Sequence, residues 1–191
     1  DIGMYHIDIR LINAMQPETR TINDLDIHSC EFTACLETVK KKSGWAEKKG
    51  KLPPGRGIGI GCGVFVSGAG YPIYRSQFPH SNAVVKVQED GSKAILFTGE
   101  ADIGQGSDTV LTQAAAEAMG VSFDRMSVIS ADSDLTPLGF GAYSSRVTLM
   151  GGNASKMAGD EIRQQVLTMA SEIMGVPADR LTARDNRIFE I

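Results

Sequence analysis

Apolar residues recur at helical spacing in three long stretches of this chain. In residues 29–42 they repeat every three to four positions, and a lysine-rich end follows, as expected at the carboxyl end of a helix. The same spacing runs through residues 107–119, closed by Gly120, and through residues 154–173, closed by Gly175. A shorter apolar pattern in residues 1–14 stops before Pro17. The pattern therefore predicts one short helix that ends near Asn13 and three longer ones.

Alternation with a period of two marks the predicted strands. Residues 82–88 and 93–98 alternate on either side of a turn at residues 89–92, which predicts a β-hairpin. Residues 125–129 predict a further strand, and residues 187–191 look like a strand stopped midway. Residues 57–66 alternate glycine with β-favouring side chains. They predict a strand whose glycine face lies close to a helix or a ligand.

Together these elements predict an α+β fold, in which helices pack against a mixed β-sheet. Residues 1–56 are expected to form a helical lead-in and linker, and residues 57–191 an α+β domain. Residues 67–81 form a long aromatic-rich segment without a regular pattern. Two roles stay open for it, lining a substrate entrance or covering the sheet.

Composition narrows the class of protein. The 191 residues carry a net charge of −4, so a basic footprint for nucleic acid is absent. No apolar run approaches the ~18–20 residues that span a bilayer. The three cysteines, Cys30, Cys35 and Cys62, lack the spacing of a zinc or iron–sulfur site. We therefore expect reduced thiols, a cytoplasmic location and neither nucleic-acid nor membrane partners. The polar start suggests a piece of a larger subunit.

A glycine loop links the strand at 93–98 to the helix at 107–119. A strand that runs through glycines into a helix start gathers free backbone N–H groups, which favour an anion such as a phosphate. Gly104 and Gly106 allow close backbone approach, and Gln105 between them offers amide donors and an acceptor to a heterocycle. Ser107 or Asp108 is expected to cap the helix. The alternative is a glycine turn with an ordinary cap.

A second polar cluster precedes the last helix. Residues 139–148 contain glycines, hydroxyl side chains and Arg146, the residue types that hold phosphate. Asp132 and Asp134 are expected to cap a turn, since no third metal ligand stands at a fixed spacing. Two successive strand–loop–helix units place two anion sites on one sheet edge. The residues alone therefore predict a nucleotide-like cofactor held mainly by backbone groups.

Three stretches together, residues 99–109, 130–137 and 143–154, resemble the molybdenum hydroxylase family of xanthine dehydrogenase and aldehyde oxidoreductase relatives. Their order and spacing match that family's large subunit, and residues 11–15 and 43–59 resemble it as well. The loops are most similar to the 4-hydroxybenzoyl-CoA reductase branch, alpha subunit. This branch implies aromatic degradation by reductive dehydroxylation of 4-hydroxybenzoyl-CoA. Hydroxylation of an aldehyde, purine or N-heterocycle, or a non-enzymatic nucleotide-binding module, are the alternatives.

The resemblance implies a molybdopterin cytosine dinucleotide cofactor with molybdenum. It also implies iron–sulfur clusters and FAD on partner subunits or domains, the remainder of the same large subunit as a partner, and a small aromatic or CoA-thioester substrate. The first loop would hold the pterin and pyrophosphate end, and the second the dinucleotide. The implied cofactor-binding residues are Gly104, Gln105, Gly106, Ser107, Asp108, Thr109, Ser144, Ser145, Arg146, Val147 and Thr148.

The family's catalytic glutamate is not among these residues, so no catalytic or metal-binding residue is predicted and the piece alone is expected to be inactive. Glu100 and Asp102, in the first loop, are expected to support the loop or the helix end.

Overall fold

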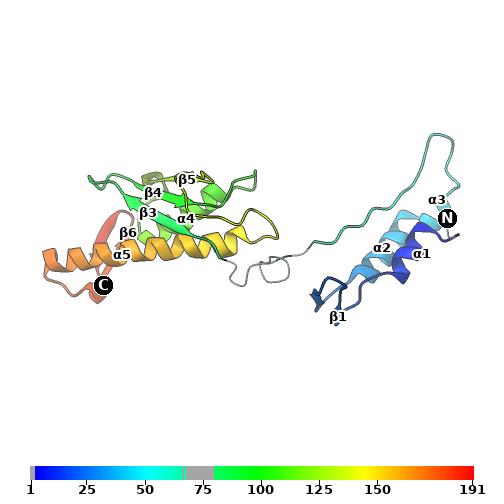
Figure 1. Cartoon of the computed structure of the whole chain (residues 1–191), viewed down its shortest axis with the longest axis horizontal. Helices are drawn as coiled ribbons and strands as arrows, with labels where there is room; N and C mark the ends of the chain where they lie inside the picture. The colour runs from blue at the N-terminus through cyan, green and yellow to red at the C-terminus, as the bar shows by residue number, and fades with distance from the viewer. Residues whose placement is uncertain (1–2, 66, 68–79) are drawn as a thin grey trace. The chain divides into compact units, whose positions relative to one another are not determined.

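The computed structural model describes residues 3–65, 67 and 80–191. The chain divides into two compact units, Asp1–Phe65 and Val66–Ile191, drawn in Figure 1. The sequence placed a domain boundary after residue 56, and those domain limits stay a prediction. Most of the aromatic-rich segment at 67–81 lies outside the described residues.

The first unit is built from short elements. Helix α1 (His6–Ile12) confirms the predicted short helix, and α2 (Phe32–Ser43) confirms the second. A third helix, α3 (Trp45–Lys48), falls where a linker was predicted. The strands β1 (Thr19–Arg20) and β2 (Asp26–Ile27) pair antiparallel, and no strand was predicted within residues 1–56. Two residues a strand are too few for an alternation pattern to show.

A small core holds the first unit together. Ile7, Leu36 and Trp45 are buried, one from each helix. Lys40 Nζ lies 3.2 Å from Asp8 Oδ1 and links α2 to α1. Helix α2 ends at Gly44, which adopts the left-handed conformation, and α3 starts directly after it. Trp45, which lies in the region predicted to be lead-in and linker, is therefore a core residue of a three-helix cluster.

The strand predicted from the glycine alternation is wrong for the part of it that is described. Residues 57–65 are not in a strand and pair with no other described segment. No described atom lies within 4 Å of a Cβ built on Gly57, Gly59, Gly61 or Gly63. The expected close neighbour of the glycine face is therefore absent from the described residues. Alternation alone does not supply the hydrogen-bonding partner that a strand needs.

The second unit contains a three-stranded mixed sheet in the order β3–β4–β5. Strands β3 (Ala83–Val87) and β4 (Ala94–Thr98) pair antiparallel, which confirms the hairpin. Strand β5 (Met126–Ser130), preceded by a 3-10 turn at Phe123–Arg125, confirms the third predicted strand. It pairs parallel with β4, with Thr98 opposite Ser130. Helix α4 (Ser107–Met119) connects these two strands and ends at Gly120, as predicted.

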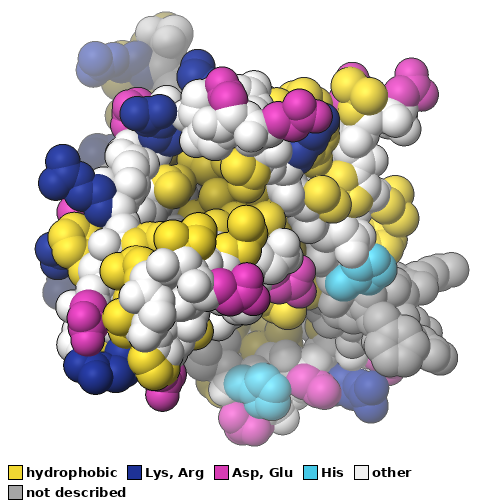
Figure 2. Space-filling model, turned by 90° about the vertical axis from the view of Figure 1, so that its left-hand side faces the viewer, with side chains coloured by type: hydrophobic (Ala, Val, Ile, Leu, Met, Phe, Trp, Pro, Cys, Tyr) yellow, Lys and Arg dark blue, Asp and Glu magenta, His cyan; other side chains and the backbone are white. Residues whose placement is uncertain are grey.

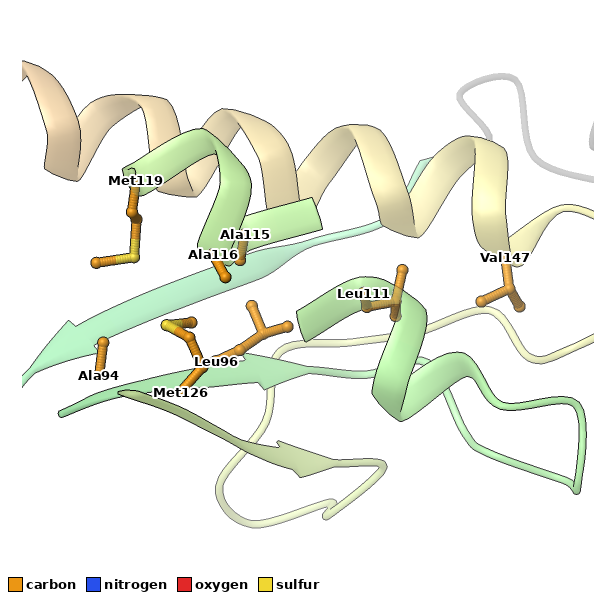
Figure 3. Packing of buried hydrophobic residues seen from close by; sticks show 8 residues of the cluster. All are labelled: Ala94, Leu96, Leu111, Ala115, Ala116, Met119, Met126 and Val147. Carbon is orange, nitrogen blue, oxygen red and sulfur yellow. The ribbon is translucent and has the colours of Figure 1, made fainter. Parts of the chain in front are cut away.

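Helix α5 (Gly152–Met174) follows a π-helical turn (Val147–Gly151) and ends at Gly175, which confirms the last predicted helix. Helices α4 and α5 lie over the same face of the sheet, as Figure 3 shows. Leu96 of β4 and Met126 of β5 point toward α4, whose Leu111 and Ala115 are also in the core. The apolar face of α4 and the alternate side chains of β4 are buried together, as their two periodicities require.

The helices α4 and α5 approach each other closely at Gly159. A Cβ on Gly159 would lie 2.7 Å from Ala115 O and 2.8 Å from Ala118 Cβ. The small residues on both helices therefore set their separation.

The chain ends in a hairpin that follows a 3-10 turn at Ala178–Arg180. It consists of β6 (Leu181–Arg184) and β7 (Arg187–Glu190), which pair antiparallel. The sequence predicted only the second of these strands. Leu181 packs with Leu167 and Ala170 of α5 in a second small core.

The observed architecture confirms the predicted α+β class with helices against a mixed sheet. None of the helices in the described part of the chain is long and apolar enough to cross a membrane.

Candidate functional site

Two loops leave the sheet at the same edge. Because β4 and β5 are parallel neighbours, the segments after Thr98 and after Ser130 start side by side. Their backbones touch at Gly99 and Gly139, where a Cβ on Gly99 would lie 2.2 Å from Gly139 N and from Pro137 O. Only glycine fits such a contact. The predicted juxtaposition of the two loops on one edge is confirmed. We call residues 99–106 loop 1 and residues 131–146 loop 2.

In loop 1 the helix start is capped by Asp102. Its Oδ1 accepts hydrogen bonds from Gly104 N at 2.8 Å and Gly106 N at 3.4 Å, and its Oδ2 from Asp108 N at 3.2 Å. These amide donors, first Gly104 N and then Asp108 N, lower the pKa of the Asp102 carboxyl. No side-chain cap from Ser107 or Asp108 is seen in the described residues, so the predicted cap was wrong in its residue.

The carboxylate therefore occupies a cradle of main-chain amides at the N-terminus of α4. Backbone N–H groups that converge in this way bind anions. The backbone N–H groups expected to bind an anion are present in loop 1. In this structure they donate to the carboxylate of Asp102.

Gln105 folds back onto its own loop. Its Oε1 accepts from Ile103 N at 2.6 Å, and its Nε2 donates to Ala101 O at 3.0 Å and to Ser107 Oγ at 3.1 Å. Ser107 is itself buried, and its Oγ donates to Ala101 O. The amide that was expected to contact a heterocycle is here a brace for the loop.

Space over loop 1 is open where a ligand would approach. Gly104 and Gly106 have φ values of 100° and 81°, and no described atom lies within 4 Å of a Cβ built on either. Asp108 Oδ1 is buried and has no hydrogen-bond partner among the described residues. An unpaired acceptor fits a ligand that brings N–H donors. Thr109, one residue further into α4, is exposed.

Loop 2 ends in a turn that carries the other predicted residues. Ser144 and Ser145 adopt left-handed φ values of 49° and 57°, which are uncommon outside glycine. Val147 is buried and Thr148 is exposed, both in the π-helical turn before α5. Such turns often occur at functional sites. The two serines therefore form a strained corner beside the start of a helix.

Arg146 points into the protein. Its side chain is 1% exposed and pairs with Glu100, which is fully buried, with Nη1 at 2.9 Å from both Oε1 and Oε2. Nη1 also donates to Gly141 O, and Nη2 donates to His80 O at 2.6 Å and Ser81 Oγ at 2.7 Å. Ser81 Oγ in turn donates to Glu100 Oε1. The sequence singled out Arg146 as a cation for phosphate and did not pair it with Glu100.

Asp132 caps the turn of loop 2, as predicted. Its Oδ1 accepts from Asp134 N at 2.9 Å and Leu135 N at 3.0 Å. Across residues 3–65, 67 and 80–191, no group of three His, Cys, Asp or Glu side chains is placed to hold a metal ion. The polar groups described at this edge are backbone amides, hydroxyls and a buried ion pair.

A separate cavity of about 580 Å³ lies at the opposite end of the sheet. Its lining includes Met119, Ile162 and Val166, with Lys93 and Arg125 among its charged residues. Figure 2 views this end, where hydrophobic side chains gather around a hollow. None of the residues predicted to bind a cofactor contributes to it.

Comparison with known proteins shows the family to which the chain is similar. Residues 38–191 match the family model described as the molybdopterin cofactor-binding domain. The chain is 32% identical over 152 residues to the probable hypoxanthine oxidase of Escherichia coli K12, a match that covers 78% of this chain and 15% of that protein. It is 31% identical over 150 residues to the gamma subunit of the 6-hydroxypseudooxynicotine dehydrogenase complex of Paenarthrobacter nicotinovorans, covering 78% and 18%.

Among solved structures, the Cu,Mo-CO dehydrogenase in its carbon monoxide reduced state gives a TM-score of 0.57 at 22% identity. The match covers 98% of this chain and 26% of that one, and it supports the fold alone. The chain thus spans about a quarter or less of the length of the proteins it matches.

Proposed function

Since the chain belongs to the molybdopterin cofactor-binding domain family, we propose that loops 1 and 2 hold the dinucleotide form of that cofactor within a molybdenum hydroxylase subunit. The observation that carries the proposal is the meeting of the two loops at one sheet edge. There the amide cradle at the start of α4 and the serine corner before α5 follow neighbouring parallel strands. A ligand with two phosphates and a polar ring needs two such places, whereas a single phosphate needs one.

The residues that would hold the cofactor come from both loops. Gly104, Gln105, Gly106, Ser107, Asp108 and Thr109 would hold the pterin and pyrophosphate end. Ser144, Ser145, Val147 and Thr148 would hold the nucleotide end, and Arg146 would contribute from the interior. In the amide cradle, an incoming phosphate would take the position of the Asp102 carboxylate, since both are acceptors for the same N–H groups. When bound, the cofactor supplies the redox chemistry at molybdenum.

The substrate proposed from the resemblance is 4-hydroxybenzoyl-CoA, with reductive loss of the phenolic hydroxyl. The names of two relatives favour a second candidate, hydroxylation of a purine or an N-heterocyclic aromatic compound. Both reactions would need the remainder of the subunit, with iron–sulfur and flavin partners. The cytosine form of the dinucleotide belongs to the same proposal.

The test uses the intact subunit, purified with its partner subunits. Elemental analysis gives molybdenum per subunit, and acid release followed by chromatography gives the nucleotide. Gln105→Ala should reduce both about two- to tenfold, the range expected for lost hydrogen bonds. Gln165→Ala, the same change at an exposed position of α5, is the matched control. Full molybdenum and nucleotide content in the Gln105 variant would contradict the assigned loop, and their absence from the wild-type subunit would contradict the function.

The substrate is tested separately. Reduction of 4-hydroxybenzoyl-CoA is assayed beside oxidation of hypoxanthine, an aldehyde and quinoline. Turnover of the oxidised group only would exclude the hydroxybenzoyl-CoA assignment and leave the cofactor assignment standing.

A further inference from the structure

The buried ion pair between Glu100 and Arg146 lies directly beneath the two loops. Glu100 follows β4, and Arg146 follows the turn at Ser144 and Ser145, 46 positions later in the chain. Both side chains are almost wholly buried, at 0% and 1% exposure. Two charges removed from water in this way stay charged only when each is well paired and hydrogen-bonded. The position of this pair where loops 1 and 2 meet therefore raises the question of what it does there.

The guanidinium of Arg146 joins three separate backbone segments. It donates to His80 O before β3, to Gly141 O in loop 2, and to the Glu100 carboxylate in loop 1. Ser81 closes the network, since its Oγ accepts from Arg146 Nη2 and donates to Glu100. The Gly99–Gly139 contact holds the first residue of loop 1 against the middle of loop 2. The loops are therefore tied at two points, by a backbone contact and by a charged network.

We infer that Glu100 and Arg146 are a positioning pair, which fixes loop 1 relative to loop 2 so that their amides and hydroxyls bind one dinucleotide. This inference rests on the proposed function. According to this inference, Arg146 does not contact a phosphate. Arg146 acts by holding the backbone of His80 and Gly141, and Glu100 is as important to cofactor binding as Arg146 is.

The competing interpretation makes Arg146 a direct phosphate ligand. That role would require the side chain to leave a site where four acceptor groups already hold its two terminal nitrogens, and it would strand the Glu100 carboxylate in the interior. The Arg146 Nε is the one nitrogen of this group without a partner in the described part of the chain, and it too is buried. The geometry therefore favours the positioning role.

Two substitutions separate the interpretations in the intact subunit with its partners. Arg146→Lys keeps the charge opposite Glu100 and keeps a phosphate-binding group, but one ammonium cannot reproduce the fork that joins three segments. Glu100→Gln removes the charge that retains Arg146, so a phosphate-binding arginine would be freed by it. The positioning pair predicts about tenfold less molybdenum and nucleotide per subunit in both variants. A direct ligand predicts near wild-type content in both.

Hydrogen exchange followed by mass spectrometry measures how well the backbone of the two loops is held in place. In both variants peptides covering residues 99–109 and 139–150 should exchange at least about tenfold faster, while those of α5 keep their wild-type rate. Asp160→Asn, which removes the exposed Lys156–Asp160 pair of α5, is the control and should change nothing. Wild-type cofactor content in either variant, or cofactor loss without faster exchange in both loops, would overturn the inference. If the wild-type subunit holds no cofactor, the proposed function fails. The exchange rates of the two variants then still show whether the Glu100–Arg146 pair fixes the two loops.

Discussion

Replacing Gly159 by alanine tests whether the small residues between α4 and α5 set the separation of these two helices. A Cβ at this position would lie 2.7 Å from the backbone oxygen of Ala115, where ordinary contact begins at 3.4 Å. The helices would therefore have to separate by about 0.7 Å, a gap that forfeits a quarter to a half of each dispersion contact across it. Overpacking of this kind costs about 1–3 kcal/mol. Against it stands the gain of about 1 kcal/mol for alanine over glycine in a helix.

Gly152 of α5 gives the matched control, because no described atom lies within 4 Å of a Cβ built there. Gly152→Ala should gain up to about 1 kcal/mol in the free energy of unfolding. The two variants of one helix should therefore differ by about 1–3 kcal/mol, Gly159→Ala being the less stable. Urea unfolding followed by circular dichroism measures this as a shift in midpoint at constant m-value. Equal stability of the two variants would refute the claim that the small residues set the helix separation.

Three further predictions address the same unit. Leu96→Ala, at a fully buried position of the sheet, should lower the free energy of unfolding by about 2–5 kcal/mol in urea titrations. Ser155→Ala should raise it by about 1 kcal/mol, because the buried Ser155 Oγ has no hydrogen-bond partner among the described residues; a loss would argue that the hydroxyl is paired. Asp102→Asn should destabilise the protein near neutral pH. Since the folded-state pKa of Asp102 is lowered, the charged carboxylate stabilises the loop above its unfolded pKa of about 4, and the difference from wild type should fade as the pH drops below that value.

The sequence predicted the elements whose periodicity is long and uninterrupted. The apolar faces of α2, α4 and α5 each run over at least three turns, and left-handed glycines end them at Gly44, Gly120 and Gly175. The β3–β4 hairpin was predictable because its two strands and its turn all carry local signals. The shared edge of the two loops followed from their order along the chain, given that β4 and β5 are parallel.

Other features depend on contacts that no local pattern encodes. Residues 57–65 alternate as a strand does, yet no described segment pairs with them. The β6–β7 hairpin has its signal at Asp185 and Asn186, which take the left-handed conformation at its turn, and that signal was missed.

In the candidate site, the contacts of the charged residues could not be predicted from the sequence. The partner of Arg146 is Glu100, 46 positions earlier, and a charge at that separation has many alternative partners in a sequence. Asp102 was expected to support the helix end, and it does so by taking the amides that were assigned to a phosphate. Which acceptor occupies a set of backbone donors is decided by the geometry of the loop, so it could be seen only in the structure.

The contact between Gly99 and Gly139 has a consequence for exchanging parts between relatives. A recombination breakpoint placed between the two glycines joins a loop from one parent to a loop from another, and their main chains then meet without having been fitted to each other. Chimeras intended to alter the cofactor or its surroundings should therefore inherit residues 99–146 from a single parent. A library built in this way should yield folded members far more often than one that shuffles the two segments freely.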